Sequence, residues 1–265
     1  MAYSVKEIFY TLQGEGIQSG RPAVFCRFSG CNLWNGREED RADSACYFCD
    51  TDFLGIDGPG GGRFTSAAAL CKAIQSLWPS KESSKKSSSS RPFVVFTGGE
   101  PLLQLNTELL SCLRASGFEI AVETNGTLEA PEGIDWICVS PKPNSTLVLT
   151  KGDELKLVYP HEVRPESVAE LDFKHFLLSP LYCDSPDGRE KHLKAAIAYC
   201  QANPQWRLTM QCHKSLGKCL KAICLGRVPP EPSSSLGVII SLLLLNFVNA
   251  PRRYKLATRL AAPSQ

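Results

Sequence analysis

Residues 30–51 read GCNLWNGREEDRADSACYFCDT, and the three cysteines of this segment decide how the rest of the chain is interpreted. Cys31, Cys46 and Cys49 are spaced C-x14-C-x2-C, directly after an apolar segment, residues 23–28, that is predicted to be a strand. A Cys-x2-Cys pair lets two thiolates face one metal centre from a single turn. A third ligand can come from a loop of almost any length, because loop closure costs only about 0.6 kcal/mol per doubling of length. The segment therefore predicts a metal centre at the end of a strand.

Two kinds of metal centre fit this spacing. A structural zinc site would need a fourth ligand, another Cys or a His. A [4Fe–4S] cluster on three cysteines would instead leave one iron free for chemistry, whereas a plain electron-transfer cluster normally takes four. The spacing alone leaves both alternatives open.

Strand and helix patterns alternate along the chain. Further strands are predicted at residues 93–97, 118–123, 134–140, 155–159, 175–178 and 206–212. Helices are predicted at residues 65–78, about 101–116 and 189–202; the first is capped by Thr65 or Ser66, and the last carries Leu193, Ala196, Ile197 and Cys200 on one face. This alternation predicts an α/β fold with a mostly parallel sheet covered by helices. In such folds the active site lies at the carboxyl ends of the strands.

Length and cysteine content indicate the cellular compartment in which the protein is expected. The chain has 265 residues and 12 cysteines, too long for a disulfide scaffold, and no signal-peptide pattern is expected at its start. We therefore expect reduced cysteines in a cytoplasmic compartment. The apolar residues 236–248 are too few for a membrane span, which needs about 20.

Polar or glycine-rich segments follow four of the predicted strands. Residues 97–101 (TGGEP) combine glycines, which let a ligand approach the backbone closely, with the carboxylate of Glu100. Residues 123–126 (ETNG), 140–142 (SPK) and 179–182 (SPLY) end three more strands. Each segment alone also fits an ordinary turn. Their shared position at strand ends favours one common site.

Together these segments resemble the radical S-adenosylmethionine (SAM) enzymes, and among them the 7-carboxy-7-deazaguanine synthase family of queuosine biosynthesis. The general pattern is C-x3-C-x2-C with an aromatic residue before the last cysteine, where Phe48 stands here. The x14 insertion departs from that pattern but is a variant this family uses. The resemblance covers residues 3–217, about four-fifths of the chain. It implies a partial (β/α) barrel of radical SAM type, with cluster and SAM at the carboxyl ends of the strands.

The resemblance also implies a role for each site residue. Cys31, Cys46 and Cys49 would bind the [4Fe–4S] cluster, and Thr51 would bind Mg²⁺ beside the substrate. The SAM-binding positions would be Phe48, Gly99, Glu100, Asn125, Ser140, Pro141, Lys142, Ser179, Pro180, Leu181 and Tyr182, although Ser179 replaces the polar amide that is commoner there. The substrate-binding positions would be Leu12, Gln13, Gly14, Glu15, Gly16, Arg27, Thr97 and His213, with the Arg27 guanidinium as a fork for a carboxylate.

The implied reaction is a radical SAM rearrangement. Cleavage of SAM would lead to hydrogen-atom removal from 6-carboxy-5,6,7,8-tetrahydropterin, ring contraction and loss of ammonia, giving 7-carboxy-7-deazaguanine. The resemblance further implies an electron donor such as flavodoxin and a homodimer. We expect no direct nucleic-acid contact, because residues 1–217 carry a net charge of −4 and show no basic face.

Two domains are expected. Residues 1–217 would be the catalytic domain, with a Ser/Lys-rich loop at 81–90, and residues 218–265 an atypical extension with a net charge of +6. Another radical SAM enzyme, such as a glycyl-radical activase, would not need residues 12–16 together with Arg27. A non-enzymatic zinc- or cluster-binding protein is the remaining alternative.

Overall fold

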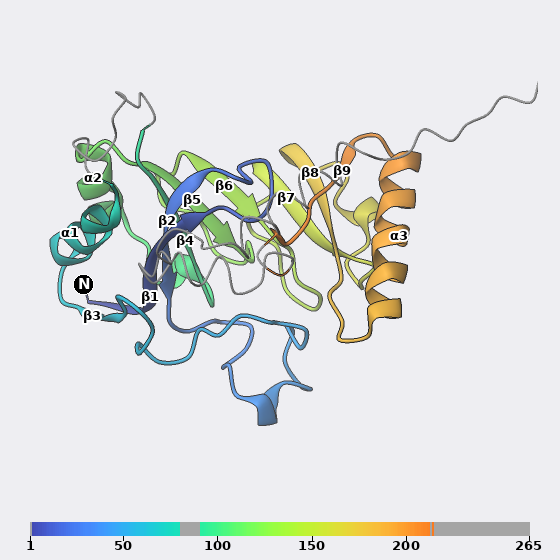
Figure 1. Cartoon of the computed structure of the whole chain (residues 1–265), viewed down its shortest axis with the longest axis horizontal. Helices are drawn as coiled ribbons and strands as arrows, with labels where there is room; N and C mark the ends of the chain where they lie inside the picture. Colours follow the sequence, from blue (N-terminus) through green and yellow to red (C-terminus); the bar gives the residue numbers. More distant parts are fainter. Residues whose placement is uncertain (1, 80–90, 213, 215–265) are drawn as a thin grey trace, which may run out of the picture. The chain divides into compact units, whose positions relative to one another are not determined.

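The computed structural model describes residues 2–79, 91–212 and 214, all within the unit Met1–Gly226 (Figure 1). The expected loop at 81–90 and the expected extension at 218–265 lie outside these described residues. The fold described below is that of this unit alone.

Within the described residues, nine strands form one sheet in the order β3-β1-β2-β4-β5-β6-β7-β8-β9. From β2 to β9 every neighbouring pair is parallel, whereas β1 runs antiparallel to both β2 and β3. The sheet is mostly parallel, which confirms the predicted α/β class. The strands are β1 (Tyr3–Leu12), β2 (Pro22–Phe28), β3 (Gly62–Phe64), β4 (Phe93–Gly98), β5 (Glu119–Thr124), β6 (Trp136–Val139), β7 (Lys151–Tyr159), β8 (Asp172–Pro180) and β9 (Trp206–Leu208).

Three α-helices and three short 3-10 helices accompany the described part of this sheet. Figure 1 shows α1 and α2 side by side near β1 and β2, and α3 beside β8 and β9. No helix of the described residues is both long enough and apolar enough to cross a membrane. The helices are α1 (Ala67–Leu77), α2 (Thr107–Ala115), α3 (Pro186–Ala202), η1 (Glu38–Asp40), η2 (Pro101–Leu103) and η3 (Pro165–Ser167).

The structure confirms α1 and corrects the helix predicted at 101–116. The side chain of Ser66 caps α1 by accepting a hydrogen bond from the Ala69 backbone N–H at 3.2 Å. The segment at 101–116 is instead two pieces, η2 and α2. Asn106 separates them, because its side chain accepts from the Leu109 backbone N–H and so begins a new helix.

Two strands were not predicted, and several elements differ from the prediction in extent; β7 and β8 begin at Lys151 and Asp172, before the predicted starts at 155 and 175. β1 and β3 are absent from the prediction, and in β1 the polar Lys6 and Glu7 interrupt the apolar pattern. β9 ends at Leu208, four residues before the predicted end. The predicted apolar face of α3 is only partly covered, since Ala196 is buried but Ile197 is exposed.

Alternation along the central strands gives the sheet two different faces. On β2, Val24, Cys26 and Phe28 point toward α1 and α2, where they join the main hydrophobic core with residues such as Leu70 and Leu109. The intervening side chains of β2 point to the opposite face. That opposite face carries most of the charged residues of the sheet and holds the candidate active site.

Candidate active site

A cavity of about 930 Å³ opens on the face of the sheet that points away from α1 and α2. Strands β1, β2, β4, β5, β7 and β8 all contribute side chains to its wall, together with the loops at their ends. The predicted site residues that line it are Leu12, Gln13, Gly14, Glu15, Arg27, Cys31, Cys46, Phe48, Cys49, Thr51, Thr97, Gly99, Asn125, Ser140, Lys142, Ser179, Pro180, Leu181 and Tyr182. The fold therefore brings most of the predicted positions into one cavity.

All three cysteines of the C-x14-C-x2-C segment lie on the cavity wall. A turn closed by the Cys49 backbone N–H and the Cys46 carbonyl at 3.0 Å brings their two thiols together. The Cys46 thiol donates a hydrogen bond to the Cys49 sulfur, which lowers the pKa of Cys49 to about 6. Burial raises the pKa of the third thiol, that of Cys31.

Among the described residues, no three His, Cys, Asp or Glu side chains are grouped so that they could hold a metal ion. A [4Fe–4S] cluster does not require such convergence on one ion, because each cysteine binds a different iron. The donor set is otherwise suitable for a cluster: three thiols at one cavity, one of them with a lowered pKa, in a loop that follows a strand.

Aromatic side chains surround the last cysteines. The Phe48 ring lies 4.2 Å from the His161 ring, and Tyr47 stacks on the same His161 at 5.8 Å. On the other side, the Lys142 ammonium lies 5.9 Å from the Phe48 ring. This packing fixes Phe48, the residue of the cysteine signature, at the cavity wall.

Glu100 does not itself line the cavity, in contrast to its neighbours. Its side chain is fully buried, and the carboxylate accepts hydrogen bonds from Leu102 N, Thr124 Oγ1 and Asn125 N at 2.9, 2.7 and 2.8 Å. Burial raises the pKa of Glu100, and these three hydrogen bonds oppose that rise. Glu100 thus connects the turn after β4 to the end of β5 and fixes the adjacent cavity-lining residues Gly99 and Asn125.

The backbone around Glu100 also approaches the cysteine loop. The Glu100 N–H donates to the Gly30 carbonyl at 2.9 Å, one residue before Cys31. At Gly99 a Cβ atom would lie 2.0 Å from that same carbonyl oxygen and 2.8 Å from the Cys31 Cβ. Only glycine fits at this position, because the two backbones lie too close for a side chain.

The predicted SAM residues at the carboxyl ends of β5, β6 and β8 line the cavity, except for Pro141. The Asn125 side chain is held by Asn32, whose Oδ1 accepts from its Nδ2 at 3.0 Å. Lys142 donates to the Ser140 hydroxyl at 2.8 Å, and burial lowers the pKa of Lys142. Pro141, between these two, does not line the cavity.

The predicted adenine segment follows β8. Ser179 is buried, whereas Tyr182 is among the most exposed aromatic residues of the described chain. The Tyr182 ring is covered by two cations, with Lys214 at 4.2 Å and Arg189 at 5.4 Å. The segment reaches from the buried sheet to the rim of the cavity.

The loop after β1 carries the predicted substrate residues. Gln13 is buried; its Nε2 donates to Glu123 at 3.1 Å, and its Oε1 accepts from the Glu15 backbone N–H at 3.2 Å. Gly16 has a positive φ of 74°, and a Cβ there would lie 2.2 Å from Glu154, so it supports the loop without lining the cavity. This loop is held in one conformation by buried carboxylates of the sheet.

Arg27 and Thr97 face the cavity from neighbouring strands, β2 and β4, at paired positions. The Arg27 Nε donates to Glu7 of β1 at 2.8 Å. A single N–H is used in this contact, so the guanidinium keeps further donors on the cavity side. Glu7 was not predicted as a site residue.

The structure adds further charged residues that sequence reasoning did not assign to the site, among them Lys156 and Glu123. Lys156 on β7 is buried to 11% side-chain exposure, and its ammonium contacts Glu15 at 3.0 Å and Glu123 at 2.9 Å. All three line the cavity. A signal existed for Lys156, a charge between Leu155 and Leu157 in the otherwise apolar segment 155–159.

Two predicted roles remain predictions: Mg²⁺ binding by Thr51 and substrate contact by His213. The Thr51 backbone N–H donates to the Cys49 sulfur, and Thr51 lines the cavity beside the cysteines, where its hydroxyl would have to bind Mg²⁺. His213 lies outside the described residues. Its neighbours Gln211 and Lys214 do line the cavity.

A mostly parallel α/β sheet that gathers three cysteines beside a glycine-rich turn at its strand ends defines a radical SAM enzyme. The 7-carboxy-7-deazaguanine synthase of Bordetella pertussis (strain Tohama I) is 57% identical over 218 residues, which cover 82% of this chain and 99% of that one. This chain therefore belongs to the 7-carboxy-7-deazaguanine synthase family.

More distant relatives support the same family. The 7-carboxy-7-deazaguanine synthase of Bacteroides thetaiotaomicron is 36% identical over 81% of this chain and 97% of that one. The crystal structure of QueE from Escherichia coli matches with a TM-score of 0.58 and 27% identity, covering 80% of this chain and 95% of that one. No protein-family model matches the chain. Membership of this family argues against the zinc-protein and glycyl-radical-activase alternatives.

We expect Glu100→Gln to lower the free energy of unfolding of the cluster-free protein by about 1–3 kcal/mol, because a carboxamide nitrogen would replace one of the buried acceptor oxygens. Urea unfolding followed by circular dichroism measures this. Glu108→Gln, an exposed residue on α2, is the matched control and should leave the free energy of unfolding unchanged. Equal stability of the two variants would show that the Glu100 hydrogen bonds are not essential.

Proposed function

We propose that this protein converts 6-carboxy-5,6,7,8-tetrahydropterin to 7-carboxy-7-deazaguanine, with loss of ammonia, in queuosine biosynthesis. The observation that carries the proposal is that one cavity joins the three cysteines to Arg27 and residues 12–15 of the loop after β1. The names of the relatives described above agree with it. An anaerobic assay with SAM, a reductant and the carboxytetrahydropterin tests the reaction directly.

The cysteines fit a [4Fe–4S] cluster, and Cys31, Cys46 and Cys49 would hold it. When bound, the cluster and SAM supply the one-electron cleavage that starts hydrogen-atom abstraction. The backbone at Gly99 gives SAM a close approach, while Asn125, Ser140, Lys142 and residues 179–182 form the adjacent wall. Phe48 also belongs to that wall, whereas Glu100 and Pro141 lie behind it and support it.

The polar wall of the sheet suits a carboxylated heterocycle. Arg27 presents its remaining N–H donors to the substrate carboxylate, while Glu7 holds the guanidinium in place. Gln13, Glu15 and Glu123 offer acceptors to the amino and ring N–H groups of the pterin. Lys156 holds two of these carboxylates in place and neutralises part of their charge.

The chain after β9 contributes to closing the cavity. The Cys212 backbone N–H donates to the Gly14 carbonyl at 3.1 Å, and the Gln211 side chain donates to Glu15 at 3.3 Å. Lys214 forms an ion pair with Asp50, the residue after the last cysteine. These contacts connect both ends of the described chain across the cavity and help exclude water from the reaction.

Four further features of the protein are proposed from the family resemblance. They are a Mg²⁺ ion bound by Thr51 next to the substrate, substrate contact by His213, a flavodoxin-like electron donor and a homodimer without direct nucleic-acid contact. A reducing cytoplasmic location agrees with the ten free cysteines of the described residues. Mg²⁺ commonly takes most of its ligands from substrate and water, so a single hydroxyl from the protein is sufficient.

We expect Cys46→Ala to leave less iron than one [4Fe–4S] cluster per chain and to abolish 5′-deoxyadenosine formation, because one of three ligands is lost. Iron analysis and product chromatography after anaerobic reconstitution measure both. Cys200→Ala, at a half-buried cysteine on α3, is the control and should keep iron and activity. Full iron and activity in Cys46→Ala would refute the ligand assignment.

We expect Arg27→Ala to weaken substrate binding by about 2–5 kcal/mol, which is roughly 30-fold or more in Kd. The cluster and SAM binding should remain. Equilibrium binding of the pterin to the SAM-loaded protein measures the loss. Arg114→Ala, which breaks a surface ion pair with Asp135, is the matched control and should bind normally. Unchanged affinity in Arg27→Ala would exclude Arg27 from substrate binding.

We propose that residues 218–265 do not belong to the catalytic fold, since the match to relatives covers 82% of this chain and nearly their full length. Cutting the chain after Gly217 should leave the melting temperature and cluster content unchanged and activity at least as high as that of the full chain. Calorimetry and iron analysis of both forms measure this. A truncated protein that unfolds or loses its cluster would show that the extension is part of the fold.

A further inference from the structure

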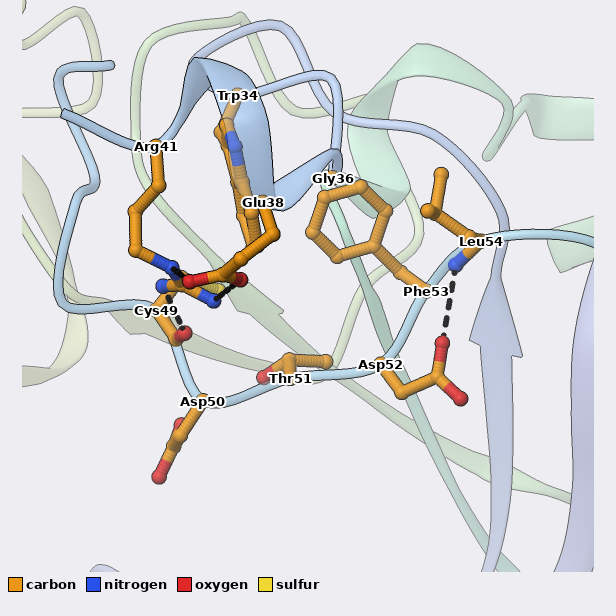
Figure 2. A pocket seen from close by; sticks show the side chains of 10 residues that line it. All are labelled: Trp34, Gly36, Glu38, Arg41, Cys49, Asp50, Thr51, Asp52, Phe53 and Leu54. Carbon is orange, nitrogen blue, oxygen red and sulfur yellow. Dashed lines mark hydrogen bonds and ion pairs between the residues drawn. The ribbon is translucent and has the colours of Figure 1, made fainter. Parts of the chain in front are cut away.

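The insertion between the first two cysteines folds around one side chain, Arg41. Figure 2 shows Arg41 in a smaller cavity of about 270 Å³ beside the active site, with its guanidinium between Glu38 and the backbone at Cys49. Trp34 and Phe53 form the apolar part of this cavity. The 14-residue insertion contains no α-helix or strand, only the three-residue η1.

Arg41 donates four hydrogen bonds, which divide into two pairs. Nε and Nη2 donate to the two carboxylate oxygens of Glu38 at 2.6 and 2.8 Å, a bidentate arrangement. Nη1 donates to the carbonyls of Tyr47 and Cys49 at 2.9 and 2.8 Å. One guanidinium therefore links η1 to the turn that carries Cys46 and Cys49.

The guanidinium also rests on a fixed aromatic surface. It lies 4.2 Å from the Trp34 ring. Trp34 is itself 7% exposed, packs edge-on against Phe53 at 5.6 Å and donates its indole N–H to the Arg37 carbonyl at 3.1 Å. Because Trp34 is held on both sides, the position of Arg41 over it is defined.

Charge adds to this geometry. The Arg41 guanidinium is always protonated, and its Nη1 lies 2.8 Å from the carbonyl oxygen of Cys49. Net charge near an iron–sulfur cluster is also one of the factors that set its reduction potential.

We propose that Arg41 is a positioning residue for the [4Fe–4S] cluster: it holds the Cys46–Cys49 turn in place by its carbonyls and places a positive charge beside these two ligands. The inference rests on the proposed function, because it concerns the cluster of that site. Arg41 contacts Cys49 through the backbone carbonyl, and it therefore acts on the cluster through the turn. This role explains how a long insertion keeps two ligands at a defined position.

The test compares R41Q and R41K in the full-length, anaerobically reconstituted protein. R37Q is the matched control, because Arg37 lies in the same insertion but its side chain is 68% exposed and pairs with the exposed Glu39 at 3.7 Å. We expect iron loss to the chelator bathophenanthroline disulfonate to be about 10-fold faster or more in R41Q and R41K. A lysine ammonium has three N–H groups and no planar fork, so it cannot replace the four hydrogen bonds that Arg41 donates. R37Q should lose iron at the parent rate.

A second measurement separates charge from geometry. The midpoint potential of the cluster should become more negative in R41Q, which lacks the cation, and stay near the parent value in R41K, which keeps it. Iron retention in R41Q or R41K equal to that of R37Q would overturn the proposal. An unchanged potential in R41Q would equally count against a cation beside the ligands.

Folding is checked on the cluster-free proteins. The contacts of Arg41 lie within residues 34–49, so urea unfolding of R41Q should match that of the parent. The proposal would be overturned if R41Q destabilised the cluster-free protein enough to account for its faster iron loss, since Arg41 would then be a general stabiliser. None of these measurements uses the pterin, and the reaction itself is assayed separately. A parent that holds its cluster but gives no product in that assay would refute only the proposed reaction, whereas a parent without iron would refute both.

Discussion

The buried carboxylate of Glu100 is the interaction on which the geometry of the site depends. A carboxylate without solvent contact is stable only if hydrogen bonds replace its hydration, and three donors from η2 and the end of β5 do so here. The backbone N–H of the same residue holds the Gly30 carbonyl beside Cys31. One residue thus fixes the ends of β2, β4 and β5 relative to one another, and with them the edge of the cavity.

The rest of the cavity wall carries charged side chains that face the open cavity. Arg27 is paired with Glu7, and Lys156 with Glu15 and Glu123, so these two cations of the wall each have a carboxylate beside them. Such pairs keep charged groups tolerable on a half-buried face while leaving donors and acceptors directed at a ligand. The apolar packing of α1 and α2 on the other face supplies the stability that this polar face lacks.

The sequence predicted those parts of the site that consist of short contiguous segments. The cysteines, the turn at Gly99 and the segments after β5, β6 and β8 were predicted because each follows an apolar strand, and parallel strands bring such ends together. It missed Glu7 and Lys156, since isolated charges inside strands carry no local signal of their partners. It also missed β1, whose polar side chains face the cavity and so hide the strand pattern.

The sequence by itself determined the class of fold and the short segments that form the site, because glycine turns and the alternation of strands with helices are local properties of the chain. Ligand spacing alone left zinc and cluster open, and the resemblance to a known family indicated the kind of chemistry. Only the tertiary structure decided which charges meet. The pairing of β1 with β2 places Glu7 beside Arg27, and β7 brings Lys156 to a loop 141 residues away. The tertiary structure also decided that Glu100 is buried and connects two strand ends, whereas its neighbour Gly99 lines the cavity. Burial and long-range contact belong to the folded sheet, and no local segment specifies them.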